Sequence, residues 1–140
     1  MEIRAARAGD RDGVIGLWEV CELTRPWNDP VADFDRAAGG PASDVLVGDE
    51  AGILIATAMV GHDGHRGWVY YLAVRPDRQG RGHGHALMRA CEAWLRDRRI
   101  PKIQLMVRET NERVLGFYAA IGYERQAVQV LGRFLEPDLT

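Results

Sequence analysis

Residues 72–87 read LAVRPDRQGRGHGHAL, and this stretch decides the fold that the sequence predicts. It begins as an apolar strand, continues as a loop with glycines at alternate positions 80, 82 and 84, and ends in an amphipathic helix. Such glycines let the backbone turn tightly with its N–H groups inward, and ahead of a helix N-terminus these donors form an anion site. Arg75, Arg78 and Arg81 flank the loop. The stretch therefore favours a ligand with phosphate groups over the alternative, a surface connection with solvated charges.

The spacing of the glycines excludes two common phosphate-binding motifs. A dinucleotide fingerprint needs Gly-x-Gly-x-x-Gly, but a count from Gly80 or Gly82 places His85 or Leu87 where the third glycine should stand. A nucleotide P-loop needs Gly-Lys followed by Ser or Thr, and the single lysine, Lys102, lies elsewhere. The ligand is therefore of another phosphate-bearing class.

The composition predicts one domain over residues 1–140. A chain of 140 residues with 46% hydrophobic residues buries roughly 68–70% of its unfolded surface, which is enough for a core. The net charge of −2 argues against a nucleic-acid partner. No apolar run approaches the ~20 residues that span a bilayer, and the first residues, MEIRAARAGD, have no apolar signal region. We therefore expect a cytoplasmic protein with no membrane partner.

The cysteines and histidines do not indicate a metal site. Cys21 and Cys91 each fall on the apolar face of an expected helix, where a free thiol packs as a small hydrophobe. A disulfide between them is not expected in a chain without an export signal. His62 and His65 lack further ligands at matching spacing, so no bound metal is expected.

Hydrophobic periodicity predicts strands and helices in a mixed order. Helices are expected after Asp10 as N-cap, over 31–38, from about 85 to 95 and over 111–120, the last with Gly122 as its C-cap. Expected strands cover 2–5, 45–47, 53–60, 68–74 and 103–107, with one or two more in 123–135. This order predicts an α/β or α+β fold with helices packed on the faces of one sheet.

Three linked motifs resemble those of one enzyme family. Residues 79–84, QGRGHG, resemble the Gln/Arg-x-x-Gly-x-Gly/Ala signature of the GNAT superfamily of acyl-CoA-dependent N-acetyltransferases. The preceding YLAVRP at 71–76 is similar to that family's fourth strand. Downstream, Leu105 to Val107 lead to Asn111 and then to GFYAAIGYE at 116–124, which resembles the family's final helix and Gly-Tyr-Glu series.

The resemblance covers about residues 43–126 and implies the fold in more detail. It implies a mixed, mostly antiparallel sheet of about six or seven strands with helices on both faces. Residues 25–30 and 61–67 also resemble a small bacterial branch, the YpeA type.

The resemblance implies that acetyl-CoA is the acyl donor. The loop amides would hold the pyrophosphate, and the strand before the loop would offer backbone groups to the pantetheine and an N–H to the thioester carbonyl. The implied cofactor-binding residues are Leu72, Ala73, Val74, Arg78, Gln79, Gly80, Arg81, Gly82, His83, Gly84, Asn111 and Tyr118. Asn111 can equally serve as a helix N-cap, and one residue can do both.

The resemblance also implies catalytic roles. Tyr118 would protonate the departing thiolate, although a core aromatic with one hydrogen bond is the alternative. Many family members carry a glutamate base on the fourth strand, but Tyr70 occupies that position here and residues 67–74 contain no carboxylate. The candidate bases are His65 or Asp63 in the preceding turn and Glu109 after the fifth strand, each of which could instead be solvated surface.

The acceptor is expected to be a primary amine of a small molecule, a protein or a peptide. The loop that holds Arg25, Trp27, Asn28 and Asp29 combines a cation, an aromatic ring and a carboxylate, so these are the candidate substrate-binding residues. Trp27 could equally be a lid packed on the core. The alternative function is an acyl-CoA-binding sensor without turnover, which the missing strand glutamate favours. The oligomeric state stays open, with a homodimer as one outcome.

Overall fold

The computed structural model describes residues 1–136. The chain divides into two compact units, Met1–Leu105 and Met106–Thr140. The first unit contains β1 (Glu2–Ala5), η1 (Ala8–Asp10), α1 (Arg11–Val20), α2 (Pro30–Ala37), β2 (Ser43–Glu50), β3 (Ile53–His62), β4 (Gly67–Val74), η2 (Pro76–Arg78), α3 (His83–Asp97) and β5 (Ile103–Leu105). The second unit contains α4 (Glu112–Ala120). The mixed α/β class that the sequence predicts is confirmed.

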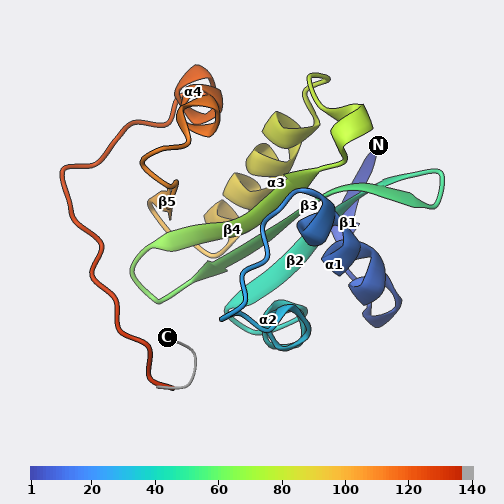
Figure 1. Ribbon diagram of the computed structural model, residues 1–140, viewed down its shortest axis with the longest axis horizontal. Coiled ribbons are helices and arrows are strands. Elements are labelled where there is room, and N and C mark those ends of the chain that lie inside the picture. The colour runs from blue at the N-terminus through green and yellow to red at the C-terminus, as the bar shows by residue number, and fades with distance from the viewer. Residues whose placement is uncertain (137–140) are drawn as a thin grey trace. The chain divides into compact units, whose positions relative to one another are not determined.

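The first unit is built on a five-stranded sheet in the order β1-β2-β3-β4-β5 (Figure 1). The first four strands pair antiparallel; short turns join β2 to β3 and β3 to β4, whereas α1 and α2 lie between β1 and β2 in the chain. The chain then crosses over through α3, and β5 pairs parallel with β4. Mixed, mostly antiparallel pairing is thus as the sequence predicts.

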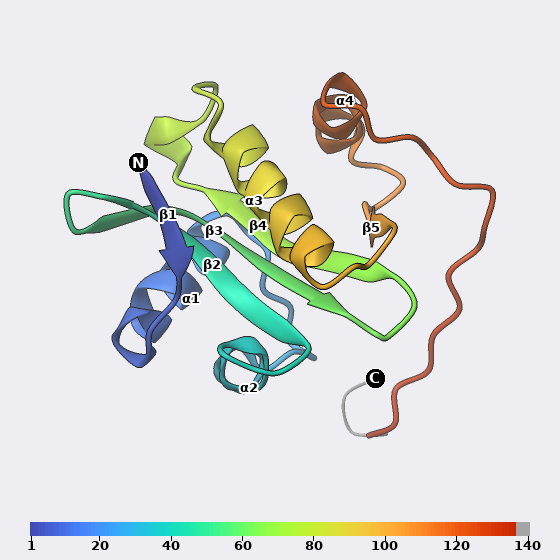
Figure 2. The same ribbon diagram turned by 180° about the vertical axis from the view of Figure 1, so that it is seen from behind.

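Helices cover both faces of this sheet. α1 and α2 pack on one face, and α3 packs on the other, which Figure 2 turns toward the viewer. Side chains along β2 alternate between the two faces of the sheet. Val45 and Val47 pack in the core under α1 and α2, while Leu46 points to the opposite face. A side chain at Gly67 would collide with Leu95 of α3, so this glycine lets the helix approach the sheet.

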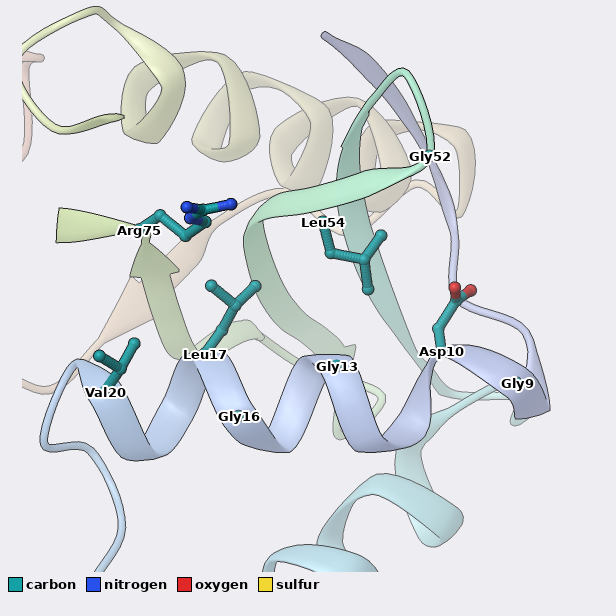
Figure 3. A pocket seen from close by; sticks show the side chains of 9 residues that line it. All are labelled: Gly9, Asp10, Gly13, Gly16, Leu17, Val20, Gly52, Leu54 and Arg75. Atoms are coloured by element: carbon teal, nitrogen blue, oxygen red, sulfur yellow. The ribbon is translucent and has the colours of Figure 1, made fainter. Parts of the chain in front are cut away.

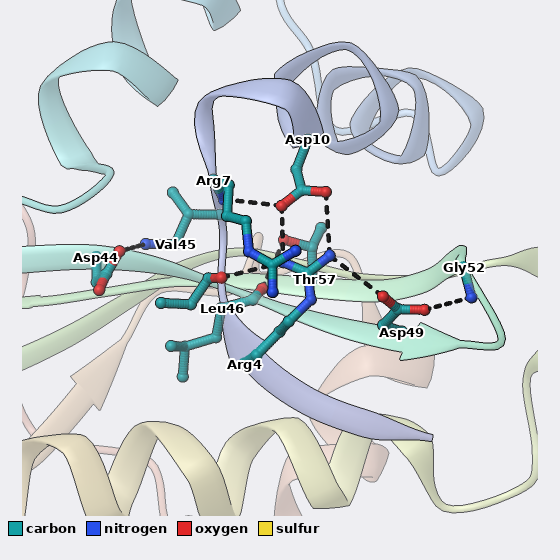
Figure 4. A network of polar contacts seen from close by, with 10 residues as sticks. Arg4, Arg7, Asp10, Asp44, Val45, Leu46, Asp49, Gly52 and Thr57 are labelled. Carbon is teal, nitrogen blue, oxygen red and sulfur yellow. Dashed lines mark hydrogen bonds and ion pairs between the residues drawn. The ribbon is translucent and has the colours of Figure 1, made fainter.

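An ion-pair network ties β1 to the start of α1 (Figure 4). The guanidinium of Arg4 lies 2.7 Å from Asp10 and 3.2 Å from Asp49. Asp10 stands at the N-cap position of α1, but its carboxylate accepts from the Arg7 N–H at 2.8 Å and makes no cap bond to the helix. Asp10 is thus the N-cap residue that the sequence predicts, but its side chain does not make the usual cap bond. The bond from Arg4 lowers the pKa of the Asp10 carboxyl.

The expected strand or strands in 123–135 are absent from the described residues. Apolar side chains there, including Val128, Val130 and Leu131, are exposed. A strand forms only where a neighbouring edge accepts its hydrogen bonds, and the described part of the second unit holds no strand. The sheet therefore has five strands over residues 1–136, and the prediction of about six or seven is too high.

Within residues 106–136 the second unit holds one helix, with the predicted Asn111 as its N-cap and Gly122 just after its C-cap residue, Ile121. Asn111 stands at the N-cap of α4, and its side chain accepts from the Val114 N–H at 3.3 Å. Gly122 follows the helix with a φ of +97°, the left-handed conformation that favours glycine after a helix.

None of the described helices is long and apolar enough to cross a membrane. Cys21 and Cys91 are both free thiols. No cluster of three or more His, Cys, Asp or Glu side chains within residues 1–136 could hold a metal ion.

Candidate active site

The loop between η2 and α3 has a backbone suited to an anion. Gly80 and Gly82 have φ values of +77° and +83°, a region that glycine enters without strain. α3 begins at His83, and its first helical bond runs from the Ala86 N–H to the Gly82 carbonyl at 3.0 Å. The N–H groups of the first turn therefore have no acceptor within the helix. The prediction that Gly84 belongs to the loop is wrong, because Gly82 already ends the loop and places Gly84 in the helix.

The three arginines that flank the loop differ in the ion pairs that they form. Arg75 pairs with Asp77 at 3.0 Å, and Arg78 pairs with Glu50 at 3.2 Å and with Asp77 at 3.3 Å. Arg81 is exposed and makes no ion pair with a described residue. Arg81 is thus the cation of the three that can turn to a phosphate without breaking an ion pair.

β4 carries a bulge immediately before the loop. Thr57 of β3 faces Ala73, whereas Met59 faces Tyr70, so two residues of β4 stand opposite one residue of β3. Tyr71 lies in this bulge with a φ of +55°. A non-glycine residue in this region costs about 1–3 kcal/mol, so contacts of its side chain must hold it there.

Two contacts on the α1–α2 face hold Tyr71. Its hydroxyl donates to the Asp33 carboxylate of α2 at 2.7 Å. Its ring stacks on Trp18 of α1, with centroids 4.0 Å apart and planes 13° from parallel. Burial, followed by the bond to Asp33, raises the pKa of the Tyr71 hydroxyl. No local pattern in the sequence indicates this contact, because Tyr71 and Asp33 are 38 residues apart.

Beyond the bulge, β4 has an edge that β5 does not cover. β5 pairs only with Gly67–Val69, so Leu72, Ala73 and Val74 lie past the parallel pairing. The Val74 carbonyl accepts from the Gln79 side chain at 3.1 Å, which ties the end of the strand to the glycine loop. The structure thus brings together the predicted strand and loop residues of the cofactor site.

The second unit contains three further predicted site residues. Tyr118 is buried in α4, edge-on to Phe117 with ring centroids 5.0 Å apart and to Tyr123 at 5.7 Å. Asn111 caps this helix, and Glu109 lies in an exposed turn before it. These residues belong to a different unit from the loop and β4.

The predicted substrate-binding residues are engaged in local contacts between α1 and α2. The Arg25 guanidinium donates to the carbonyls of Glu22 at 2.8 Å and Thr24 at 2.9 Å. Asp29 caps α2 by accepting from the Ala32 N–H at 3.1 Å. The other two predicted residues, Trp27 and Asn28, are exposed.

Two cavities lie in the first unit. The cavity of about 460 Å³ in Figure 3 runs along the glycines of α1 and contains Arg75 but no predicted cofactor or substrate residue. A second cavity of about 350 Å³, named here the hairpin cavity, lies where α2 faces the connected ends of β3 and β4. Its polar and aromatic lining residues are Asp33, Arg36, His62, Asp63, Trp68 and Tyr70.

The candidate bases of the β3–β4 turn differ in their surroundings. The Asp63 carboxylate accepts from the N–H groups of Arg66 at 2.8 Å and His65 at 2.9 Å and from the Trp68 indole at 3.2 Å. These bonds lower the pKa of Asp63 to about 2, which makes it a weak base. His65 is exposed and lines neither cavity, whereas His62 lines the hairpin cavity.

Comparison with known proteins identifies the family. Residues 14–123 match the model of the acetyltransferase (GNAT) family. An acetyltransferase of Yersinia enterocolitica is 44% identical over 138 residues, which is 99% of this chain and 98% of the relative.

Solved structures share the fold at lower sequence identity. An aminoglycoside N-acetyltransferase, solved with a bisubstrate analogue of CoA and acetylneamine, has a TM-score of 0.81 at 17% identity and covers 95% of this chain and 97% of its own. A ribosomal-protein-alanine N-acetyltransferase of Brucella melitensis has a TM-score of 0.75 at 19% identity, covering 95% and 98%. These structures share the fold, and the family model and the Yersinia relative show that the chain belongs to the GNAT family and is an acetyltransferase.

Proposed function

We propose that this enzyme transfers the acetyl group of acetyl-CoA directly to a primary amine within a ternary complex. The observation that carries the proposal is the continuous path from the bulged end of β4 through two left-handed glycines to the N-terminus of α3. Backbone N–H groups along this path suit a pyrophosphate at the helix and a thioester at the strand. We further propose that both units form one acetyltransferase domain, because the family match spans residues 14–123.

The uncovered edge of β4 supports the thioester site. As the amine nitrogen attacks the carbonyl carbon, negative charge develops on the carbonyl oxygen, and a backbone N–H of Leu72–Val74 would stabilise it. The contacts of Tyr71 with Asp33 and Trp18 fix the bulge that sets the direction of these groups. Preorganised donors of this kind cost no reorganisation during the reaction.

The departing thiolate needs a proton, and Tyr118 is the residue that we propose as its donor. A new C–N bond forms, the C–S bond breaks, the amine loses a proton, and the thiolate gains one. The Tyr118 hydroxyl would supply the proton to sulfur, and the proton released by the amine reaches solvent directly or through a base. Asn111 would contact the pantetheine while it caps α4.

The acceptor amine must be neutral to attack. Because β4 carries no carboxylate and Asp63 is a weak base, His65 and Glu109 are the bases that we propose, with water as the link. We propose the loop of Arg25, Trp27, Asn28 and Asp29 as part of the acceptor site. Two proteins with this fold are named as an aminoglycoside N-acetyltransferase and a ribosomal-protein-alanine N-acetyltransferase. We therefore propose a small molecule or a protein as the class of acceptor.

Removal of Arg81 should weaken acetyl-CoA binding about three- to tenfold, because its guanidinium is available for a phosphate. Arg78→Ala should also weaken binding, although Arg78 is shared with Glu50 and Asp77. Titration calorimetry at low and high salt measures both, and the difference from wild type should shrink as salt rises. Arg99→Ala, at the far end of α3, is the matched control. Unchanged affinity in both loop variants would exclude the pyrophosphate site.

The value of kcat/KM should rise with pH over pH 6–9. A plot of its logarithm against pH should have a slope of about one, as expected for a single ionisation. A lysine-like amine has a pKa of ~10.4, so the reactive neutral fraction grows about tenfold per pH unit below that value. Asp63, with a pKa of about 2, stays ionised throughout this range and adds no inflection. Initial rates of thiol release at saturating acetyl-CoA give the profile. A flat profile would show that no deprotonation limits attack.

A further inference from the structure

The hairpin cavity carries a net negative charge. Asp33 pairs with Arg36 at 2.7 Å, so these two charges offset each other. His62 accepts the Gly64 N–H at its Nδ1, 3.1 Å away. Asp63 is the remaining carboxylate in the lining, and the hydrogen bonds that it accepts come from two backbone N–H groups and an indole.

The turn holds the Asp63 carboxylate in its charged form. Both oxygens accept hydrogen bonds, one from two backbone N–H groups and the other from the Trp68 indole. These donors fix the carboxylate, and they leave its full charge uncompensated because all three are neutral. The nearby Arg66 guanidinium instead donates to the His65 carbonyl at 3.2 Å.

Two aromatic side chains share the cavity lining with this exposed carboxylate. Trp68 and Tyr70 both line the cavity from β4. Burial, followed by the negative charge of Asp63, raises the pKa of the Tyr70 hydroxyl, so the phenol stays neutral. A fixed carboxylate at the edge of an indole, with a second aromatic ring in the same cavity, is an environment that attracts an organic cation.

The cavity lies next to the reacting part of β4. Tyr70 immediately precedes the bulge at Tyr71, and Asp33 of the lining is the residue that holds the Tyr71 hydroxyl. Figure 1 shows α2 at the end of the sheet where β2 begins and β3 ends. Along a strand, the two to four residues from Trp68 or Tyr70 to Leu72 span about 7–13 Å.

We propose that the hairpin cavity binds a second cationic group of the acceptor, so that the preferred substrate carries an ammonium or guanidinium about 7–13 Å from its reacting nitrogen. This inference rests on the proposed transfer to an amine and names the chemical class of that amine. Asp63 is then the specificity-determining residue, since it distinguishes a dication from a monoamine of the same length.

Two amines of equal length test the inference. Calorimetry in the presence of CoA, which holds no acetyl group, measures binding without turnover. 1,6-Diaminohexane should bind about tenfold more tightly than n-hexylamine, the difference expected for one charge-assisted contact. Asp63→Asn should remove this preference, because the amide keeps an oxygen for the two backbone donors but loses the charge.

Two further variants separate charge from structure. Trp68→Phe removes the indole donor but keeps an aromatic ring and the Asp63 charge, so the preference for the diamine should persist. Asp12→Asn makes the same change of charge beside Gly13, which lies against Leu54 near the other end of β3, and should have no effect on the preference. Melting temperatures of all variants verify that they fold.

The binding measurement tests the cavity proposal, and the transfer measurement tests the proposed function, so the two can be refuted independently. Equal affinity of the wild type for the two amines, or a diamine preference that survives in Asp63→Asn, would overturn the inference even if both amines are acetylated. Thiol release from acetyl-CoA is measured with the same two amines. Its absence with a wide panel of amines would refute the proposed function, while the calorimetry still decides whether the cavity binds a dication.

Discussion

Tyr118→Phe should lower kcat about 100-fold while changing the Kd of acetyl-CoA by less than twofold, because a general acid typically contributes 10²–10⁴-fold to a rate. Phenylalanine keeps the ring that packs edge-on against Phe117 and Tyr123, so α4 should retain its packing. The variant therefore loses the hydroxyl alone. Thiol release under saturating conditions gives kcat, and calorimetry gives Kd.

Tyr123→Phe is the matched control for this variant. It removes a hydroxyl from the ring that touches Tyr118, at a centroid distance of 5.7 Å, and should leave kcat within about threefold of wild type. A Tyr118→Phe enzyme with the wild-type rate would show that another group protonates the thiolate. Equal losses in both variants would indicate a packing effect instead.

The double variant Gly80→Ala/Gly82→Ala should weaken acetyl-CoA binding tenfold or more. Both residues have left-handed φ values, and a side chain there costs roughly 1–2 kcal/mol at each position. The loop either keeps its shape under strain or relaxes and turns its N–H groups away from the pyrophosphate. A tenfold loss corresponds to about 1.4 kcal/mol, so partial relaxation is sufficient.

Gly16→Ala provides the control substitution. Gly16 lies inside α1 with ordinary helical φ, and a Cβ there meets nothing within 4 Å. Alanine should stabilise this helix by about 0.5–1 kcal/mol and leave acetyl-CoA affinity unchanged. Calorimetry and thermal melting of both variants give the comparison. Unchanged affinity in a folded double variant would show that the loop does not need its left-handed glycines.

The sequence is sufficient to predict the glycine loop and the helix after it, because their signals are local. Alternate glycines and the apolar stripe after them depend on neighbouring residues, so the loop and α3 follow from the pattern. The pattern does not fix the boundary between the loop and α3, since a glycine such as Gly84 fits a loop and a first helical turn equally well. The left-handed Gly82 decides this, and its φ is a property of the folded chain.

Contacts between distant residues could not be predicted in the same way. Tyr71 interacts with Asp33 and Trp18, and nothing in the spacing of these three residues indicates a contact. Asp10 is a second example. Its position before α1 suggests a side-chain bond to the helix, but its carboxylate instead binds Arg4 and accepts from the Arg7 N–H. Residues 123–135 have the composition of strands, but pairing requires a partner edge that composition does not reveal.

The central claim is direct transfer from acetyl-CoA to an amine, and the simultaneous measurement of thiol release and amide formation tests it most directly. Purified protein is mixed with acetyl-CoA and a panel of diamines, monoamines and peptides, with thermal shift as the binding control. We expect one acetylated amine, seen by mass spectrometry, for each thiol released. A thermal shift by acetyl-CoA without thiol or amide from any member of the panel would contradict it.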